Sequence, residues 1–571
     1  MLRKLAFCGR WILTLLFGVT IFLFWLFCYP HVMSYHEQYQ LFLFSFDYFL
    51  ERMTVPGGLA DYISEFLVQF YVIEWLGAFI LGFLFVLLQR LVWRLMNQLS
   101  DSNGCPAICY GLSFVPSVLL LWLMGDENVL LSYVVAILLA CGAAALMNGW
   151  DGLRKRKRLC LAVDFFLIPC LYWLIGPMAW LYTVLRVFQT GWKSLWMVVW
   201  MTALQFVAYY FFLPQWPLKS VLLGLNYYRV PMHYSVIQFV LPVVLAIIVG
   251  IVSFVPPSKR REQSVPKATL SVCVQLLLLA VLCYFGLTAG YDRDKFELIR
   301  QDYLIRNERW DEIISRAGSY QVQTAMWSNS VNLALSQKGQ LADRMFDFYQ
   351  SGEDALLMPM HSDLISNMPT AEAFFRLGLV NSAQRYMSDM QESILNGRKS
   401  GRMEKRIIEC LLINGKYVVA RKHIDLLRKS LFYRTWAEEA ALCLNNDAKV
   451  AAHSVMGRLR RLRFKEDFLF SYAEADKILG RLFWENKENK MALEYFIGQI
   501  LLNGNIPFFM QSLSWAQQYG NYTRMPLVYQ DAVNYVQQQG NVPSSPYGAY
   551  VKRMMNMAKK DKQDGRNDTA H

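Results

Sequence analysis

The first half of the chain has few charged residues. Residues 1–290 contain 19 Lys+Arg and 12 Asp+Glu, whereas residues 291–571 contain 38 and 32. Charged residues make up only 18% of the whole chain, while about a quarter is usual in soluble proteins. With 55% hydrophobic and 15% aromatic residues, the composition excludes a disordered chain and a uniformly water-soluble one. It predicts a transmembrane domain over 1–290, followed by a water-soluble domain.

The chain also lacks the short motifs that mark several enzyme classes. It contains no Gly-x4-Gly-Lys-Ser/Thr, Gly-x-Gly-x-x-Gly after a strand, Gly-x-Ser-x-Gly or His-Glu-x-x-His. ATP-driven transport, dinucleotide chemistry, serine hydrolysis and zinc proteolysis are therefore not expected. Nine of the eleven cysteines lie within 1–290, mostly in apolar runs, which indicates buried small side chains rather than a disulfide framework. The sequence indicates no particular cofactor.

Apolar runs long enough to cross about 30 Å of hydrocarbon predict an all-α bundle of about nine transmembrane helices. Residues 159–190 are long for one crossing and are divided near the middle by Gly176-Pro177, so they are counted as two short helices. The other seven predicted spans are 11–29, 68–89, 107–124, 129–148, 195–214, 235–255 and 268–287.

Basic residues set the predicted orientation of this bundle. With nine crossings, the segments on the N-terminal side carry 16 Lys/Arg and the opposite loops carry 3. Because positive loops stay in the cytoplasm, the N-terminus is expected there and residues 291–571 on the outer side. The loops 30–67 and 215–234 are rich in aromatic residues, which predicts segments lying in the membrane interface.

The water-soluble half shows helical spacing of apolar residues and almost no strand signal. Glycines recur at intervals that separate short helices, as at Gly339, Gly378 and Gly415. Residues 291–555 are therefore expected to form an array of helical hairpins that resembles tetratricopeptide repeats. Such an array is either a structural superhelix or a concave surface for a partner. The polar residues 556–571 predict a disordered tail.

Several ionisable residues fall at the predicted outer membrane face. Glu37, Asp47 and Asp61 are candidate general bases, because a carboxylate at this boundary can accept a proton. The histidines at this face are candidate ligands for a divalent metal, although the same residues equally suit a solvated interface. These candidate metal ligands are His31, His36 and His233. Inside a predicted span, Asp164 is expected to pair with Arg158.

Several short segments resemble an uncharacterised bacterial family of multi-pass membrane proteins. The resemblance would cover nearly the whole chain and implies the bacterial inner membrane, with a periplasmic C-terminal domain, but no activity. The acidic, partly helical first loop and the outer soluble domain are also similar in architecture to the GT-C glycosyltransferases. The segments that carry the family resemblance are Tyr35-His-Glu-Gln-Tyr39, Pro56-Gly-Gly-Leu-Ala-Asp-Tyr62, Phe66-Leu-x-Gln-Phe70, Val331-Asn-Leu-Ala-Leu335 and Lys338-Gly-Gln-Leu341.

Three functions remain open at this point. The first is an envelope scaffold, anchored in the bilayer, that presents its helical array to a protein partner. The second is a membrane glycosyltransferase that takes a lipid-linked glycan donor and uses a carboxylate of loop 30–67 as base. The third is a transporter. A nucleic-acid partner is not expected, because the basic run Arg154–Arg158 is a topology signal with no interleaved aromatic residues.

Overall fold

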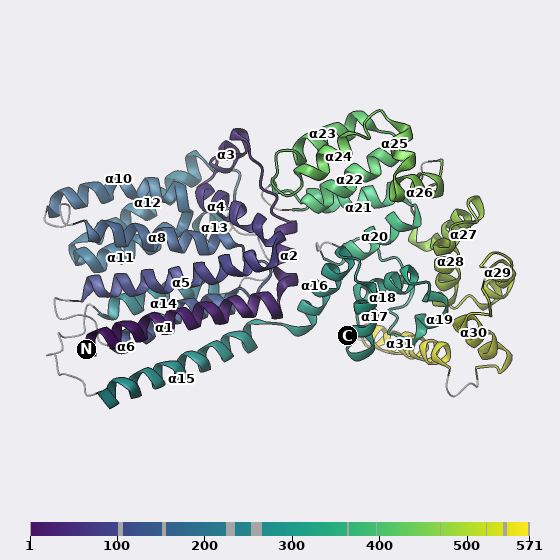
Figure 1. Ribbon diagram of the computed structural model, residues 1–571, viewed down its shortest axis with the longest axis horizontal. Coiled ribbons are helices and arrows are strands. Elements are labelled where there is room, and N and C mark those ends of the chain that lie inside the picture. The colour runs from purple at the N-terminus through teal and green to yellow at the C-terminus, as the bar shows by residue number, and fades with distance from the viewer. Residues whose placement is uncertain are drawn as a thin grey trace. The chain divides into compact units, whose positions relative to one another are not determined.

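In the computed structural model, the described residues form helices and no strand (Figure 1). The chain divides into two compact units. Unit 1 consists of residues 1–293 together with 395–400 and 429–432, and unit 2 contains the rest. The structure describes the whole chain except residues 1, 101–106, 151–155, 224–234, 253–264, 362–364, 395–396, 467, 469, 521, 541–544 and 569–571.

Unit 1 is a bundle of long apolar helices with shorter helices between them (Figure 1). Its helices are α1 (Leu2–Leu23), α2 (Pro30–Gln38), α3 (Phe46–Arg52), α4 (Gly58–Val68), α5 (Glu74–Leu99), α6 (Ala107–Leu112), α7 (Val115–Leu123), α8 (Leu131–Gly149), α10 (Lys157–Ile175), α11 (Ala179–Thr190), α12 (Trp196–Phe211), α13 (Leu218–Leu223), α14 (Val236–Ile251) and α15 (Val265–Gly290).

Helices α5 and α8 lie at the centre of unit 1. Helix α8 packs on α4, α5 and α11, and it is the most enclosed of the membrane-length helices, while α15 is the most exposed. Small residues permit the close packing: a side chain at Gly18 of α1 would meet Val86 of α5 at 2.8 Å. Polar residues in the bundle pair with one another, as where Gln89 donates to Ser113 at 2.7 Å.

Among the residues that the structure describes, six helical stretches are long and apolar enough to cross a membrane. They are Gly9–Cys28, Glu74–Leu99, Leu131–Gly149, Arg158–Thr190, Trp192–Phe211 and Cys273–Gly290. The prediction of about nine spans also counted two shorter apolar helices, Cys109–Leu123 and Val236–Ile251. It divided 159–190 as well, where a 3-10 turn at Gly176–Met178 interrupts the helical stretch. The number of crossings therefore stays a prediction.

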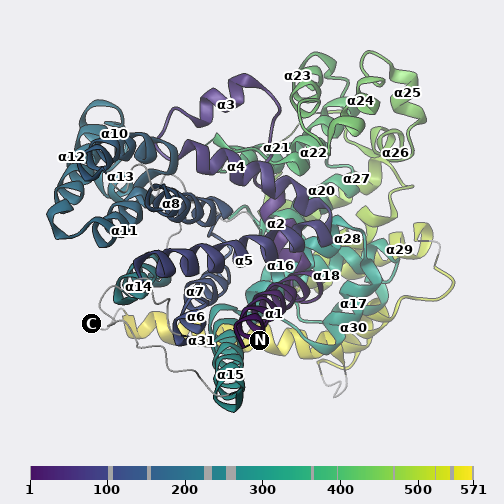
Figure 2. The same ribbon diagram turned by 60° about the vertical axis from the view of Figure 1, so that its left-hand side comes forward.

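Unit 2 is built from short helices, many of them packed against their neighbours along the chain. Figure 2 shows α22 to α26 gathered into one group. The helices are α16 (Arg293–Arg306), α17 (Trp310–Ser319), α18 (Ala325–Gln337), α19 (Leu341–Arg344), α20 (Asn367–Leu377), α21 (Val380–Glu392), α22 (Gly401–Ile413), α23 (Tyr417–Leu427), α24 (Arg434–Ala441), α25 (Asp447–Ala452), α26 (Ser454–Leu462), α27 (Ala475–Glu485), α28 (Lys490–Leu502), α29 (Ile506–Tyr519), α30 (Leu527–Gln537) and α31 (Pro546–Asp568).

The same turn closes four of these helices. Each turn glycine has a positive φ, between 64° and 89°, which a residue with a side chain adopts only at a cost. The residue after the glycine donates its N–H to the carbonyl five residues earlier, at 2.8–3.1 Å, and so caps the helix. The sequence thus marked real helix boundaries, although the tetratricopeptide family itself stays a prediction. The four turn glycines are Gly339, Gly378, Gly415 and Gly504.

The C-terminal helix extends beyond the boundary that the sequence indicated. Helix α31 runs to Asp568, through residues for which a disordered tail was predicted. The lysines and glutamines of this stretch have good helix propensity, so a helix can continue without an apolar stripe. The disordered tail itself stays a prediction.

Candidate functional site

The candidate metal ligands lie in two different situations. His31 and His36 are buried in α2, with 1% and 5% of their surface exposed. His233 lies outside the described residues, so the three-histidine site stays a prediction. Among the residues that the structure describes, no group of three or more His, Cys, Asp or Glu side chains could hold a metal ion.

The three candidate bases differ sharply in environment. Asp47 is exposed in the first turn of α3, where a carboxylate favours the positive end of the helix. Glu37 is buried in α2 at 4% exposure, and Asp61 is buried in α4, also at 4%. Loop 30–67 is thus largely an internal part of unit 1, with Tyr35 and Phe42 buried as well. Its interfacial position and the catalytic roles stay predictions.

Asp61 belongs to a buried group of charges, the α4 ion cluster, formed by Tyr48, Arg52, Asp61, Glu65 and Arg398. Arg52 Nε donates to Glu65 at 3.0 Å, and Tyr48 also donates to this carboxylate. Arg398 donates from Nε to Glu65 at 2.6 Å and from Nη2 to Asp61 at 2.7 Å. Two carboxylates are therefore balanced by two guanidinium groups away from water.

The two carboxylates of the cluster respond differently to the same surroundings. Burial raises the pKa of Asp61 to about 6. The positive charge of Arg398 lowers this pKa, whereas the negative charge of Glu65 raises it. Burial would also raise the pKa of Glu65, but Arg52 and Arg398 together lower it below its ordinary value. Glu65 therefore favours the charged form more strongly than Asp61 does.

Another charged pair corrects an expectation from the sequence. Asp164 of α10 pairs with Arg186 of α11, at 2.8 Å between Oδ2 and Nη2, and not with Arg158. Both side chains are buried at 1% exposure or less. Arg158 precedes Asp164 on the same helix. The buried carboxylate is instead paired with a cation of the neighbouring helix that is itself buried.

A large cleft in unit 2 was not predicted from the sequence. The α21 groove has a volume of about 900 Å³ and lies between helices α20, α21 and α22 and residues of the stretch that follows α26, namely Arg463, Phe464, Lys465, Phe468, Phe470 and Tyr472. Aromatic side chains of this stretch form one wall of the groove, and neighbouring aromatic residues hold them in place. Phe470 contacts Phe374 at 4.9 Å between ring centroids, and Tyr386 and Tyr472 share a hydrogen bond through their hydroxyl groups.

Polar groups face the aromatic wall across the α21 groove. Asn414 donates to Asn381 at 2.8 Å and accepts a hydrogen bond from Arg463, also at 2.8 Å. Four cations and one carboxylate line the groove, which gives it a positive charge. Burial, with the nearby Arg460, lowers the pKa of Arg463, as expected where positive charge is not fully compensated. The charged lining residues are Arg385, Lys416, Arg463, Lys465 and Asp389.

Two signals in the sequence pointed to these residues. Asp61 and Glu65 are four residues apart, so they share one face of a helix and require nearby cations when buried. In the segment 463–472, aromatic residues at Phe468, Phe470 and Tyr472 recur at every second position, in a half where apolar spacing is otherwise helical. Such alternation is typical of an extended segment with one aromatic side, so it could have located this wall of the groove.

These features define an all-α protein in which membrane-length apolar helices are joined to a unit of short packed helices. The chain belongs to a family of unknown function (DUF6057), whose model matches residues 5–560. No curated protein and no solved structure matches the chain. The family covers nearly all of both units, in agreement with the resemblance found in the sequence.

Proposed function

We propose that this protein is a membrane-anchored binding protein that holds an acidic polypeptide segment of a partner in the α21 groove. The groove itself is the observation that carries the proposal. Its volume of about 900 Å³ lies within the range of ligand-binding clefts, and its open form suits an extended chain. The apolar helices of unit 1 serve as the anchor in the inner membrane, with unit 2 on the periplasmic side.

The chemistry of the groove favours a peptide over an apolar ligand. The side-chain amides of Asn381 and Gln384 can each donate to and accept from a peptide backbone, which is how an extended chain is fixed without regard to sequence. The aromatic wall provides contact area for side chains of the partner at low entropic cost. Lys416 and Lys465 are exposed at the groove and select for carboxylates in the partner.

Photo-crosslinking in cells tests this proposal. A benzophenone amino acid placed at Phe468, inside the groove, should form an adduct with a polypeptide whose crosslinked segment is acidic by mass spectrometry. The same group at Trp484, an exposed aromatic residue of unit 2 outside the groove lining, is the positional control. Equal adducts at both positions would argue against the groove.

Charge reversal completes the test. The double change Lys416→Glu and Lys465→Glu should abolish the adduct at Phe468, because it gives the groove the same sign as the partner. Reversal at Lys477, which is exposed and does not line the groove, should leave the adduct unchanged. An adduct that survives the double reversal, or a basic crosslinked segment, would refute the proposed partner chemistry.

A further inference from the structure

A second cavity in unit 2 is lined mainly by basic side chains. This arginine cavity has a volume of about 370 Å³ and lies between the end of α16, helices α20 and α22, and the start of α26. Six cationic side chains line it, together with three glutamates. The cationic residues are Arg306, Arg376, Arg402, Lys405, Arg406 and Arg458.

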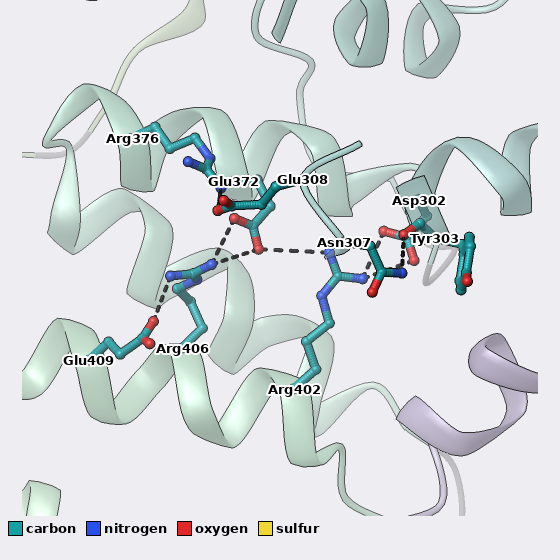
Figure 3. A network of polar contacts seen from close by, with 9 residues as sticks. All are labelled: Asp302, Tyr303, Asn307, Glu308, Glu372, Arg376, Arg402, Arg406 and Glu409. Atoms are coloured by element: carbon teal, nitrogen blue, oxygen red, sulfur yellow. Dashed lines mark hydrogen bonds and ion pairs between the residues drawn. The ribbon is translucent and has the colours of Figure 1, made fainter. Parts of the chain in front are cut away.

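Buried carboxylates hold two of the arginines in fixed positions, as Figure 3 shows. Arg402 donates to both oxygens of Asp302, at 2.8 and 2.9 Å. Arg406 donates to both oxygens of Glu372, at 3.0 and 2.8 Å, and its guanidinium lies 3.7 Å from the centre of the Phe375 ring. These contacts already order the arginine side chains, so less side-chain entropy is lost when an anion binds.

The ion pairs do not neutralise the cavity. Six cations line the cavity, against the four carboxylates Glu308, Glu372, Glu409 and the adjacent Asp302, so these groups carry a formal excess of two positive charges. Among the described residues, no carboxylate forms an ion pair with Lys405 or Arg458. Lys405 instead lies 5.0 Å from the Trp436 ring, which keeps its ammonium beside the cavity.

We propose that the arginine cavity binds a phosphate group carried by a small molecule or by a lipid headgroup. The excess of two positive charges matches the charge of a phosphomonoester near neutral pH. Guanidinium groups with fixed N–H directions suit the tetrahedral oxygens of phosphate. The first turn of α26 also lines the cavity at Val455 and Met456. Their N–H groups donate to the His453 ring, so this nine-residue helix contributes only the positive end of its dipole. A volume of about 370 Å³ admits a phosphate with a compact organic substituent.

Hydrogen–deuterium exchange of the full chain in neutral detergent tests this site. Inorganic phosphate, compared with chloride at equal ionic strength, should slow exchange in peptides from α22 and α26. At ten times the dissociation constant the slowing should be about tenfold, because the ligand binds only the closed state. In a second arm, nanodiscs that contain phosphatidic acid are compared with nanodiscs of phosphatidylcholine alone.

The two arms distinguish the sources of the phosphate. Protection by inorganic phosphate supports a soluble ligand, whereas protection only by phosphatidic acid supports a lipid headgroup. No protection in either arm overturns the proposal.

Variants locate the binding. Lys405→Gln with Arg458→Gln should raise the dissociation constant at least tenfold. Arg458→Gln alone, at an exposed position, serves if the double variant does not fold. Arg481→Gln, an exposed arginine of unit 2 outside the cavity lining, should have no effect. Unchanged binding in a folded variant of the cavity would overturn the proposal.

Discussion

Glu372 is the carboxylate on which the ion network of unit 2 depends, and its replacement by glutamine should destabilise the α20–α22 pair. The side chain is 4% exposed and accepts two hydrogen bonds from Arg406, with Arg402 at 3.7 Å. In Glu372→Gln the shape is kept, but the charge is lost and an amide N–H₂ faces two guanidinium groups. Arg402, which is buried, and Arg406, which is partly buried, then lose a shared counter-charge.

The size of the effect follows from the pKa of Glu372. Burial alone would raise this pKa, but Arg406, Arg402 and Arg376 lower it from 4.5 to about 2. This lowering corresponds to about 3 kcal/mol of stabilisation, at the lower end of the ~3–5 kcal/mol for breaking a buried ion pair. Because the pKa is lowered on folding, the stabilisation is complete above pH 4.5 and is lost as the pH falls towards 2.

Hydrogen–deuterium exchange of the full chain at neutral pH measures this change locally, which avoids assuming two-state unfolding of a two-unit protein. A loss of about 3 kcal/mol should speed exchange in peptides from α20 and α22 by roughly a hundredfold. Glu409→Gln is the matched control. Its pair with Arg406, at 2.5 Å, is one turn apart on the same helix and more exposed, so the change should stay below about 1 kcal/mol. Equal effects of the two substitutions would refute the reasoning.

Four further outcomes are expected. Burial, with the Asp343 charge, raises the pKa of Glu494 to about 8. The native state should therefore lose stability as the pH rises from 4.5 to 8. Glu494→Gln should raise the melting temperature at pH 8 and leave it unchanged at pH 4. Gly415→Ala, at φ 70° with open space around it, should cost about 1 kcal/mol by local exchange, and an unchanged rate would contradict the turn geometry. Arg398→Gln should speed exchange in α4 by two or more decades, since breaking a buried pair costs about 3–5 kcal/mol. A reporter fused after Asp292 should be active outside the cytoplasm, and a cytoplasmic result would show an even number of crossings.

The sequence by itself determined the features that depend on local composition and spacing. The low charge of residues 1–290 predicted where the membrane-length apolar helices lie, because the solvation of a segment depends on its own residues, and the six described helical stretches of this kind all lie in that half. The turn glycine at Gly415 predicted a helix end, because a positive φ is a property of a single residue.

Only the tertiary structure decided which charges meet. Asp61 was identified as a candidate from its position, but its partner Arg398 lies 337 residues away and carries no local signal. Asp164 was assigned to Arg158, the nearest cation in sequence, whereas packing of α10 on α11 brings Arg186 to it. A buried carboxylate is stabilised by the cation that helix packing places within about 3 Å of it. Residue spacing along the chain does not show which helices pack together, so it does not show which cation this is.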